Sequence, residues 1–146
     1  MSISYRDIAC CIDESEAAGR ALAHAAAIRD LVGGRLRVVH VIAPPAFLVS
    51  MAASLGGAPV HDPQLEREAA EMWLGEQAQA TGADAVLLEG HPASTACAWA
   101  REAGCDLLVA ARHRGLMGRA LLGSFASYLA HHAPCPVLLV PAGRDD

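Results

Sequence analysis

The segment 110–124 contains the residues of this sequence best suited to bind a charged ligand. It carries three arginines in a chain of net charge −5, and it ends with Gly123 and Ser124. Ser124 begins a predicted helix, and the free N–H groups and dipole of a helix start attract anions. Glycine lets the backbone approach a phosphate closely, and serine can donate its hydroxyl hydrogen. The segment fits either an anion site or a capped helix beside solvated arginines.

The elements that would position this segment alternate between strands and helices. Short apolar or β-branched runs predict strands, and apolar residues at helical spacing predict the helices between them. The predicted strands are 5–12, 36–42, 85–88, 106–111 and 136–140, and the predicted helices are 18–32, 63–80, 92–103 and 124–132. The stretch 46–62, with Gly56, Gly57 and Pro59, is predicted to be a loop.

This alternation implies parallel strands joined by right-handed crossovers. Residues 137–140 are apolar at every position, which is typical of a strand covered on both faces. We therefore expect one α/β domain over 1–146, with a flexible tail over 142–146. Ligands of such sheets bind beyond the carboxyl ends of the strands, where the strand order reverses. If the first strand is central, that point lies between the first and fourth strands, next to segment 110–124.

Composition excludes several classes of protein. The length of 146 residues fits one domain, and the negative net charge argues against a general affinity for nucleic acid. No apolar run approaches the roughly 20 residues that cross a bilayer, and the N-terminus lacks the order of a signal peptide. We expect a cytoplasmic protein with neither a membrane nor a nucleic acid as its partner.

The five cysteines are odd in number and show no C-x-x-C spacing, so neither a zinc site nor a disulfide framework is indicated. We interpret them as small buried hydrophobes, with a redox role for Cys10 and Cys11 as the alternative. Successive strand residues point to opposite faces, which argues against a bond between these two. The seven histidines show no metal-ligand spacing, so no metal site is predicted.

Asp13 follows the first predicted strand and has two possible roles. With Glu16 three residues later, it resembles a capping box for the first helix. It also stands at the sheet edge where a ligand is expected. Capping alone and ligand contact both remain open at this point.

Three parts of the chain resemble the universal stress protein family. The end, GSFASYLAHHAPCPVLLV followed by Pro141, has the family's pattern, and so does the opening, IDESE at 12–16 and VVHVI at 38–42. The middle matches through EGHPA at 89–93 and AGCDLLV at 103–109. The resemblance implies a three-layer α/β/α sandwich of the adenine nucleotide α-hydrolase-like, Rossmann-like class. Its five-stranded parallel sheet would have the order 3-2-1-4-5, and homodimers would form through the last strand, 136–140.

One branch of this family binds ATP through the motif G-x2-G-x9-G-[ST], and another branch lacks the motif and does not bind ATP. Gly123 and Ser124 match the end of the motif, whereas Ala110 and His113 replace its two leading glycines. At position 113 a side chain stands where the motif offers bare backbone, and a positive φ there would strain it.

The resemblance therefore implies two functions. The first is a dimeric regulatory module of the stress response that binds ATP or a related adenine nucleotide, with or without Mg, between the first and fourth strands. The second is a dimeric interaction protein that binds no nucleotide and has an unidentified protein partner, which the loss of the two glycines favours. The resemblance matches Asp13, Val41, Gly123 and Ser124 to the adenosine and phosphate positions of the ATP-binding branch. The predicted cofactor-site residues are Ile12, Asp13, Val41, Ala110, Arg112, His113, Gly123, Ser124 and Phe125.

An enzyme is the third class considered. The sequence has no Walker lysine motif, no paired catalytic carboxylates and no nucleophile–base pair of recommended spacing. No catalytic residue is assigned, and weak nucleotide hydrolysis is the most that we expect.

Overall fold

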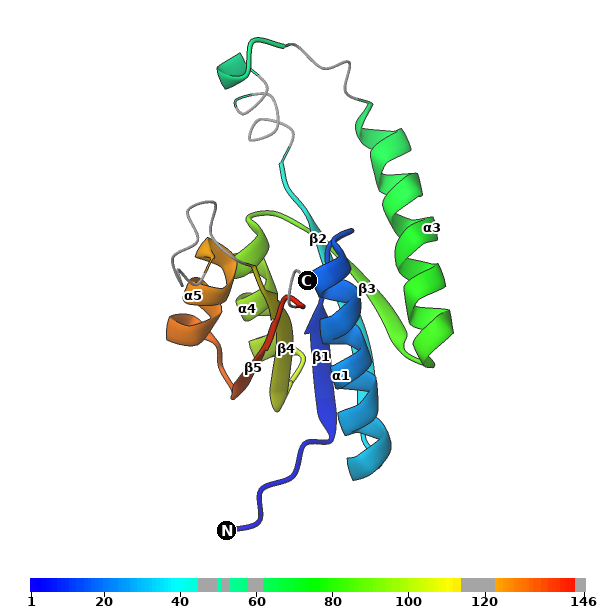
Figure 1. The fold of residues 1–146 in the computed structure, drawn as a ribbon, viewed down its shortest axis with the longest axis vertical. Coiled ribbons are helices and arrows are strands. Elements are labelled where there is room, and N and C mark those ends of the chain that lie inside the picture. The colour runs from blue at the N-terminus through cyan, green and yellow to red at the C-terminus, as the bar shows by residue number, and fades with distance from the viewer. Residues whose placement is uncertain (45–49, 51–52, 58–61, 114–122, 144–146) are drawn as a thin grey trace.

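A computed structural model of the chain describes residues 1–44, 50, 53–57, 62–113 and 123–143. Strands and helices alternate along it (Figure 1). In chain order the elements are β1 (Asp7–Cys11), α1 (Glu16–Val32), β2 (Arg35–Ile42), α3 (Pro63–Thr81), β3 (Asp84–Glu89), α4 (Pro92–Glu102), β4 (Leu107–Arg112), α5 (Ser124–His132) and β5 (Val137–Pro141). No helix among these described residues is long and apolar enough to cross a membrane.

The five strands form one parallel sheet in the order β3-β2-β1-β4-β5. β1 is central, and its Cys10 lies opposite Val38 of β2 and Val109 of β4. The predicted strand order is confirmed. The chain winds away from β1 in both directions, so the topological switch point lies between β1 and β4, where a ligand was expected.

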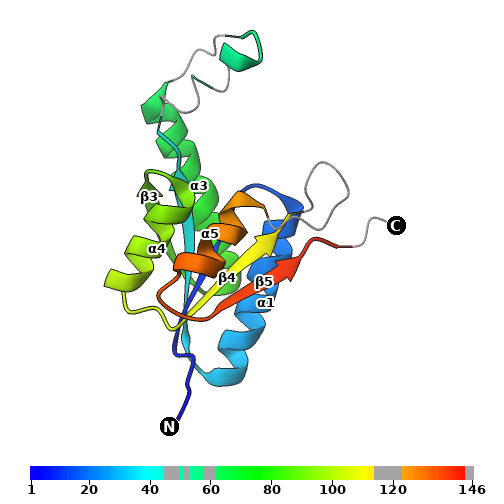
Figure 2. The same cartoon turned by 90° about the vertical axis from the view of Figure 1, so that its left-hand side faces the viewer.

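Helices cover both faces of the sheet, which confirms the three-layer sandwich. α1 and α3 lie on one face, and α4 and α5 lie on the other (Figure 2). Successive residues of β1 alternate between the two cores: Ile8 and Cys10 pack under α1, whereas Ala9 and Cys11 pack under α4. All four are buried, which explains why this strand reads as a continuous apolar run.

The ends of the elements follow the predicted limits within two residues, because local signals mark most of them. Gly33 and Gly82 end α1 and α3 with φ values of 69° and 65°, a left-handed conformation that suits glycine. In the stretch 46–62, Ser50, Ala53 and Ser54 are helical, so the predicted loop is not wholly irregular. The remainder of that stretch, except 55–57 and 62, lies outside the described residues.

Of the two roles left open for Asp13, the capping box is wrong. The N-cap of α1 is Ser15, whose Oγ accepts a hydrogen bond from the Ala18 N–H at 3.2 Å. Asp13 lies two residues before this cap, and its Oδ1 accepts from the Ser15 N–H at 2.9 Å. Asp13 therefore shapes the turn between β1 and α1 and leaves its second carboxylate oxygen for other contacts.

Arg29 connects the end of α1 to the end of α3. Its Nη1 donates to the carbonyl oxygens of Thr81 at 2.6 Å and Gly82 at 3.1 Å. α3 has no basic residue in its own last turn, so the guanidinium supplies the positive charge that the terminal carbonyls of a helix attract. This contact fixes α3 beside α1.

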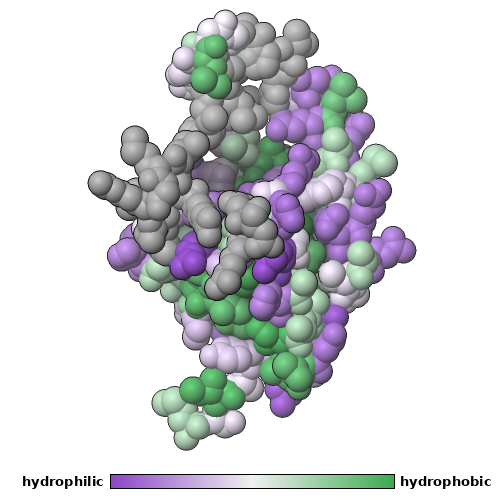
Figure 3. Space-filling view, viewed as in Figure 1, coloured by the Kyte–Doolittle hydropathy of each residue, from purple (hydrophilic) through white to green (hydrophobic). Residues whose placement is uncertain are grey.

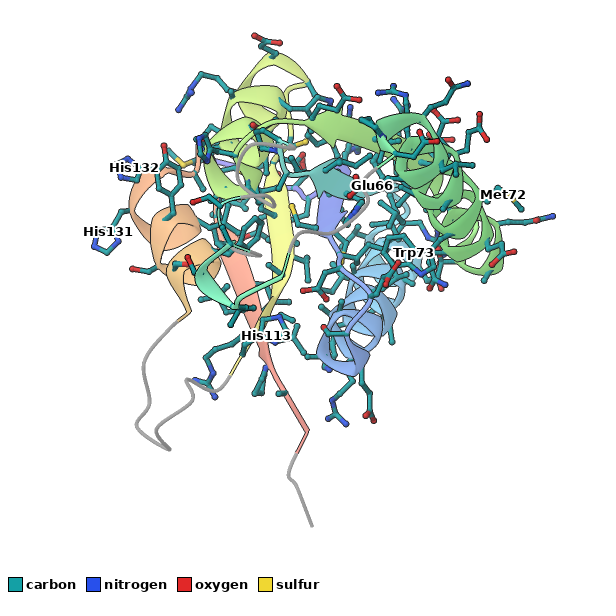
Figure 4. All side chains as sticks on the ribbon, turned by 90° about the horizontal axis from the view of Figure 1, so that it is seen from above. Glu66, Met72, Trp73, His113, His131 and His132 are labelled. Atoms are coloured by element: carbon teal, nitrogen blue, oxygen red, sulfur yellow. The ribbon has the colours of Figure 1, made fainter. Side chains whose placement is uncertain are left out.

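The two tryptophans pack against the two cores, one on each face of the sheet. Trp73 of α3 packs against the core on the α1 side, and in Figure 4 it points from α3 toward the sheet. Trp99 of α4 packs on the opposite face, with the Arg37 guanidinium 4.9 Å from its ring centroid.

Gly34 and Gly19 provide a matched test of this packing. A Cβ at Gly34, between α1 and β2, would lie 2.9 Å from the carbonyl oxygens of Tyr5 and Arg6, whereas a Cβ at Gly19 of α1 meets nothing within 4 Å. We predict that Gly34→Ala lowers the free energy of unfolding by about 1–3 kcal/mol. Gly19→Ala should raise it by about 0.5–1 kcal/mol. Urea unfolding of both variants measures these changes, and equal effects would contradict the tight approach at Gly34.

Candidate functional site

A cavity of about 240 Å³ opens at the carboxyl ends of β1, β2 and β4. Strands β2 and β4, on either side of the switch point, supply its apolar walls together with α4 and α5. The described residues that form them include Val39, Val41, Pro92, Ala110 and Phe125. Asp13, His40 and His113 add polar groups. A concave, mainly apolar cavity with a few polar groups is typical of a small-molecule site.

The structure brings six of the nine predicted site residues to this cavity: Ile12, Asp13, Val41, Ala110, His113 and Phe125. Arg112, Gly123 and Ser124 are not among its described lining residues. Arg112 ends β4, and its carbonyl oxygen accepts from the Ala142 N–H at 3.2 Å. Gly123 and Ser124 begin α5, the helix that carries Phe125 to the cavity.

Two further described lining residues lie where the sequence predicts a ligand: Ala111 in the segment 110–124, and His40 at the carboxyl end of the second predicted strand. Sequence reasoning missed Cys11, Ala18, Val39 and Pro92. Val39 could have been found, because it lies two residues before Val41 and so faces the same side of β2. Pro92 reaches the cavity only through the fold, since it comes from the first turn of α4.

Asp13 and His113 face each other across the switch point. His113 Nε2 lies 3.4 Å from Asp13 Oδ2, and about half of each side chain is exposed. Partial burial raises the pKa of the Asp13 carboxyl, but the hydrogen bonds from Ser15 and the nearby His113 lower it by more. The pKa therefore lies below its ordinary value, and Asp13 is a carboxylate at neutral pH.

His113 adopts this position without backbone strain. Throughout the described part of the chain only glycines have a positive φ, so the strain considered for position 113 does not arise. Ala110 is also accommodated, because it is buried within β4 opposite Cys11 and Leu139. In Figure 4 His113 lies between the end of β4 and the start of α1. The two side chains that replace glycines therefore become part of the wall and mouth of the cavity.

His40 joins the ends of β1 and β2. Its Nδ1 lies 2.8 Å from the carbonyl oxygen of Ile12, and its ring packs edge-on against Trp73 with 5.1 Å between centroids. A carbonyl oxygen can only accept, so Nδ1 donates the hydrogen of this bond. This bond holds the end of β1 where Asp13 leaves the sheet.

The start of α5 brings main-chain N–H groups close to the cavity, which Phe125 lines. Gly123 is its N-cap and, having no side chain, forms no capping hydrogen bond. The first N–H groups of a helix have no partner within the helix, so they can bind an anion. Phe125, two residues after Gly123, lines the cavity, so this end of α5 faces it.

A parallel doubly wound sheet with a cavity at its switch point defines the Rossmann-like α/β class. Residues 4–141 match the model of the universal stress protein family. The chain belongs to this family.

Similar proteins cover almost the whole chain. A curated universal stress protein of Thermus aquaticus is 37% identical over 143 residues, which is 93% of this chain and 98% of that protein. A universal stress protein in complex with cAMP aligns with a TM-score of 0.65 at 23% identity, covering 97% of this chain and 100% of that one. The universal stress protein of Archaeoglobus fulgidus in complex with dAMP aligns with a TM-score of 0.63 at 20% identity, covering 94% and 99%. At these identities the solved structures show a shared fold.

The cysteines give a prediction about reactivity. Burial raises the pKa of Cys11, which lines the cavity, to about 12, and that of Cys135 to about 11; burial also raises the pKa values of Cys10, Cys97 and Cys105. Because the thiolate is the reactive form, we expect less than one thiol per chain to react with a disulfide reagent within minutes at pH 8. All five should react in denaturant. Rapid reaction of Cys10 or Cys11 in the folded protein would support the redox alternative.

Proposed function

We propose that the chain binds an adenine nucleotide in the cavity between β1 and β4, and that the bound nucleotide regulates a dimeric module of the stress response. The observation that carries this proposal is the composition of the cavity. Its walls are apolar at Val41, Pro92 and Phe125, and the Asp13 carboxylate stands at its mouth. A flat base fits apolar walls, and a carboxylate accepts hydrogen bonds from sugar hydroxyl groups.

The solved relatives support this assignment of ligand class. Two of them carry cAMP and dAMP, and both are adenine nucleotides with a single phosphate group. The start of α5, which has no side-chain cap at Gly123, also supports the proposal, because the first N–H groups of a helix attract anions.

The second candidate is a dimeric interaction protein that binds no nucleotide. Ala110 and His113 favour it, because both positions now carry side chains in place of the family's glycines. His113 already pairs with Asp13, so a sugar hydroxyl must share that carboxylate.

Calorimetric titration with AMP and with ATP, each with and without Mg²⁺, separates the two candidates. We expect binding by the parent chain and about tenfold weaker binding by Asp13→Asn, because one charge-assisted hydrogen bond is lost. Glu14→Gln is the matched control, since Glu14 is the next carboxylate in the chain and is not among the described residues lining this cavity. Absence of binding at millimolar nucleotide, with no nucleotide released from denatured protein, would favour the second candidate.

We further propose that the dimer forms along β5. β5 is an edge strand that pairs, within the described residues, with β4 alone. Figure 3 shows hydrophobic side chains gathered beside this strand, where Val137, Leu138 and Leu139 are half-buried. Unpaired main-chain groups beside apolar side chains suit pairing with a second copy.

The direction of the main-chain groups gives a specific test. The Pro136 carbonyl accepts from the Leu108 N–H, and the Ala142 N–H donates to the Arg112 carbonyl. The main-chain groups of even-numbered residues along β5 therefore point toward β4, and those of odd-numbered residues point away from it. The N–H of Leu139 therefore points to the open edge. We expect Leu139→Pro to sediment as a monomer and Leu139→Ala, which loses similar packing but keeps the N–H, to remain at twice the chain mass. A monomeric parent chain at micromolar concentration would contradict the dimer.

A further inference from the structure

We infer that His113 recognises the phosphate group nearest the sugar, and that the site thereby selects adenine nucleotides with one phosphate. This inference rests on the proposed function and deepens it, because it assigns the ligand class of the same cavity. It starts from the contact between His113 and Asp13, two residues that the chain brings together from the ends of different strands.

The contact determines which atoms of the imidazole remain for a ligand. A carboxylate can only accept hydrogen bonds, so the nitrogen that faces Asp13, Nε2, carries a proton. Nδ1 is then the ring nitrogen that Asp13 does not contact. An imidazolium donates from both nitrogens, so Nδ1 can give a phosphate a charge-assisted hydrogen bond while Nε2 keeps its contact with Asp13.

The position of the pair joins sugar and phosphate recognition. Asp13 and His113 both line the cavity, and the apolar walls lie deeper along β2, α4 and α5. A nucleotide whose base fills the apolar part places its sugar at the mouth, beside Asp13. Its first phosphate then lies within reach of the His113 ring, which is about half exposed.

The size of the cavity and the charges around it favour a short ligand. Its volume of about 240 Å³ lies below the roughly 300–1,000 Å³ that is usual for ligand pockets. The Asp13 carboxylate stands at the mouth of this cavity. A second or third phosphate held near that carboxylate is opposed by repulsion between like charges.

The test is calorimetric titration of the full chain with adenosine, AMP and ATP in one buffer. For the parent chain we expect AMP to bind about tenfold more tightly than adenosine, as one charge-assisted hydrogen bond provides, and at least as tightly as ATP. In His113→Gly the ratio between AMP and adenosine should fall to about threefold or less. His113→Arg keeps a cation that can contact both Asp13 and a phosphate, so it should retain the preference.

His131→Gln is the control for the loss of a histidine elsewhere, because His131 is exposed on the outer side of α5 (Figure 4). It should keep the parent ratio. If adenosine and AMP bind the parent chain equally, or if His113→Gly keeps the preference for AMP, the inference is overturned while the proposed function stands. ATP binding about tenfold more tightly than AMP would overturn the selection for one phosphate. If none of the three ligands binds, the proposed function itself fails.

Discussion

The central constraint on this structure is that β1 is buried on both faces and paired on both edges. Its backbone polar groups are removed from water, so β2 and β4 must satisfy them. The ladder continues one residue past the strand, where the Ile12 N–H donates to Val39. Beyond this point the chain turns away into α1, and the gap that opens between the ends of β1 and β4 becomes the cavity. The site is therefore a consequence of how the central strand ends.

The fold was largely predictable because each element carries its own signal. Buried parallel strands need apolar residues at every position, and the glycines after α1 and α3 mark where left-handed backbone ends a helix. The role of Asp13 stayed open because Asp13 and Ser15 are both good N-cap residues, and only the length of the turn decides between them. Pattern alone does not give that length.

The candidate site was less predictable, since its geometry depends on residues that are distant in the sequence. Position 113 was identified through the family motif, and the loss of glycine there suggested strained backbone. The structure shows an unstrained residue whose ring contacts Asp13, a residue 100 positions earlier. The contacts of His40 were not predicted, because they depend on Ile12 at the end of β1 and on Trp73 of α3. None of these contacts leaves a trace in local spacing.

The hydrogen bond between Ala142 and Arg112 has a further consequence. It joins the chain just after β5 to the residue immediately before His113. One main-chain hydrogen bond thus links the end of the edge strand to the mouth of the cavity. Energetic coupling between two binding events is reciprocal. A ligand in the cavity that strengthens association along β5 through this hydrogen bond is itself bound more tightly, by the same factor, when a second copy is associated.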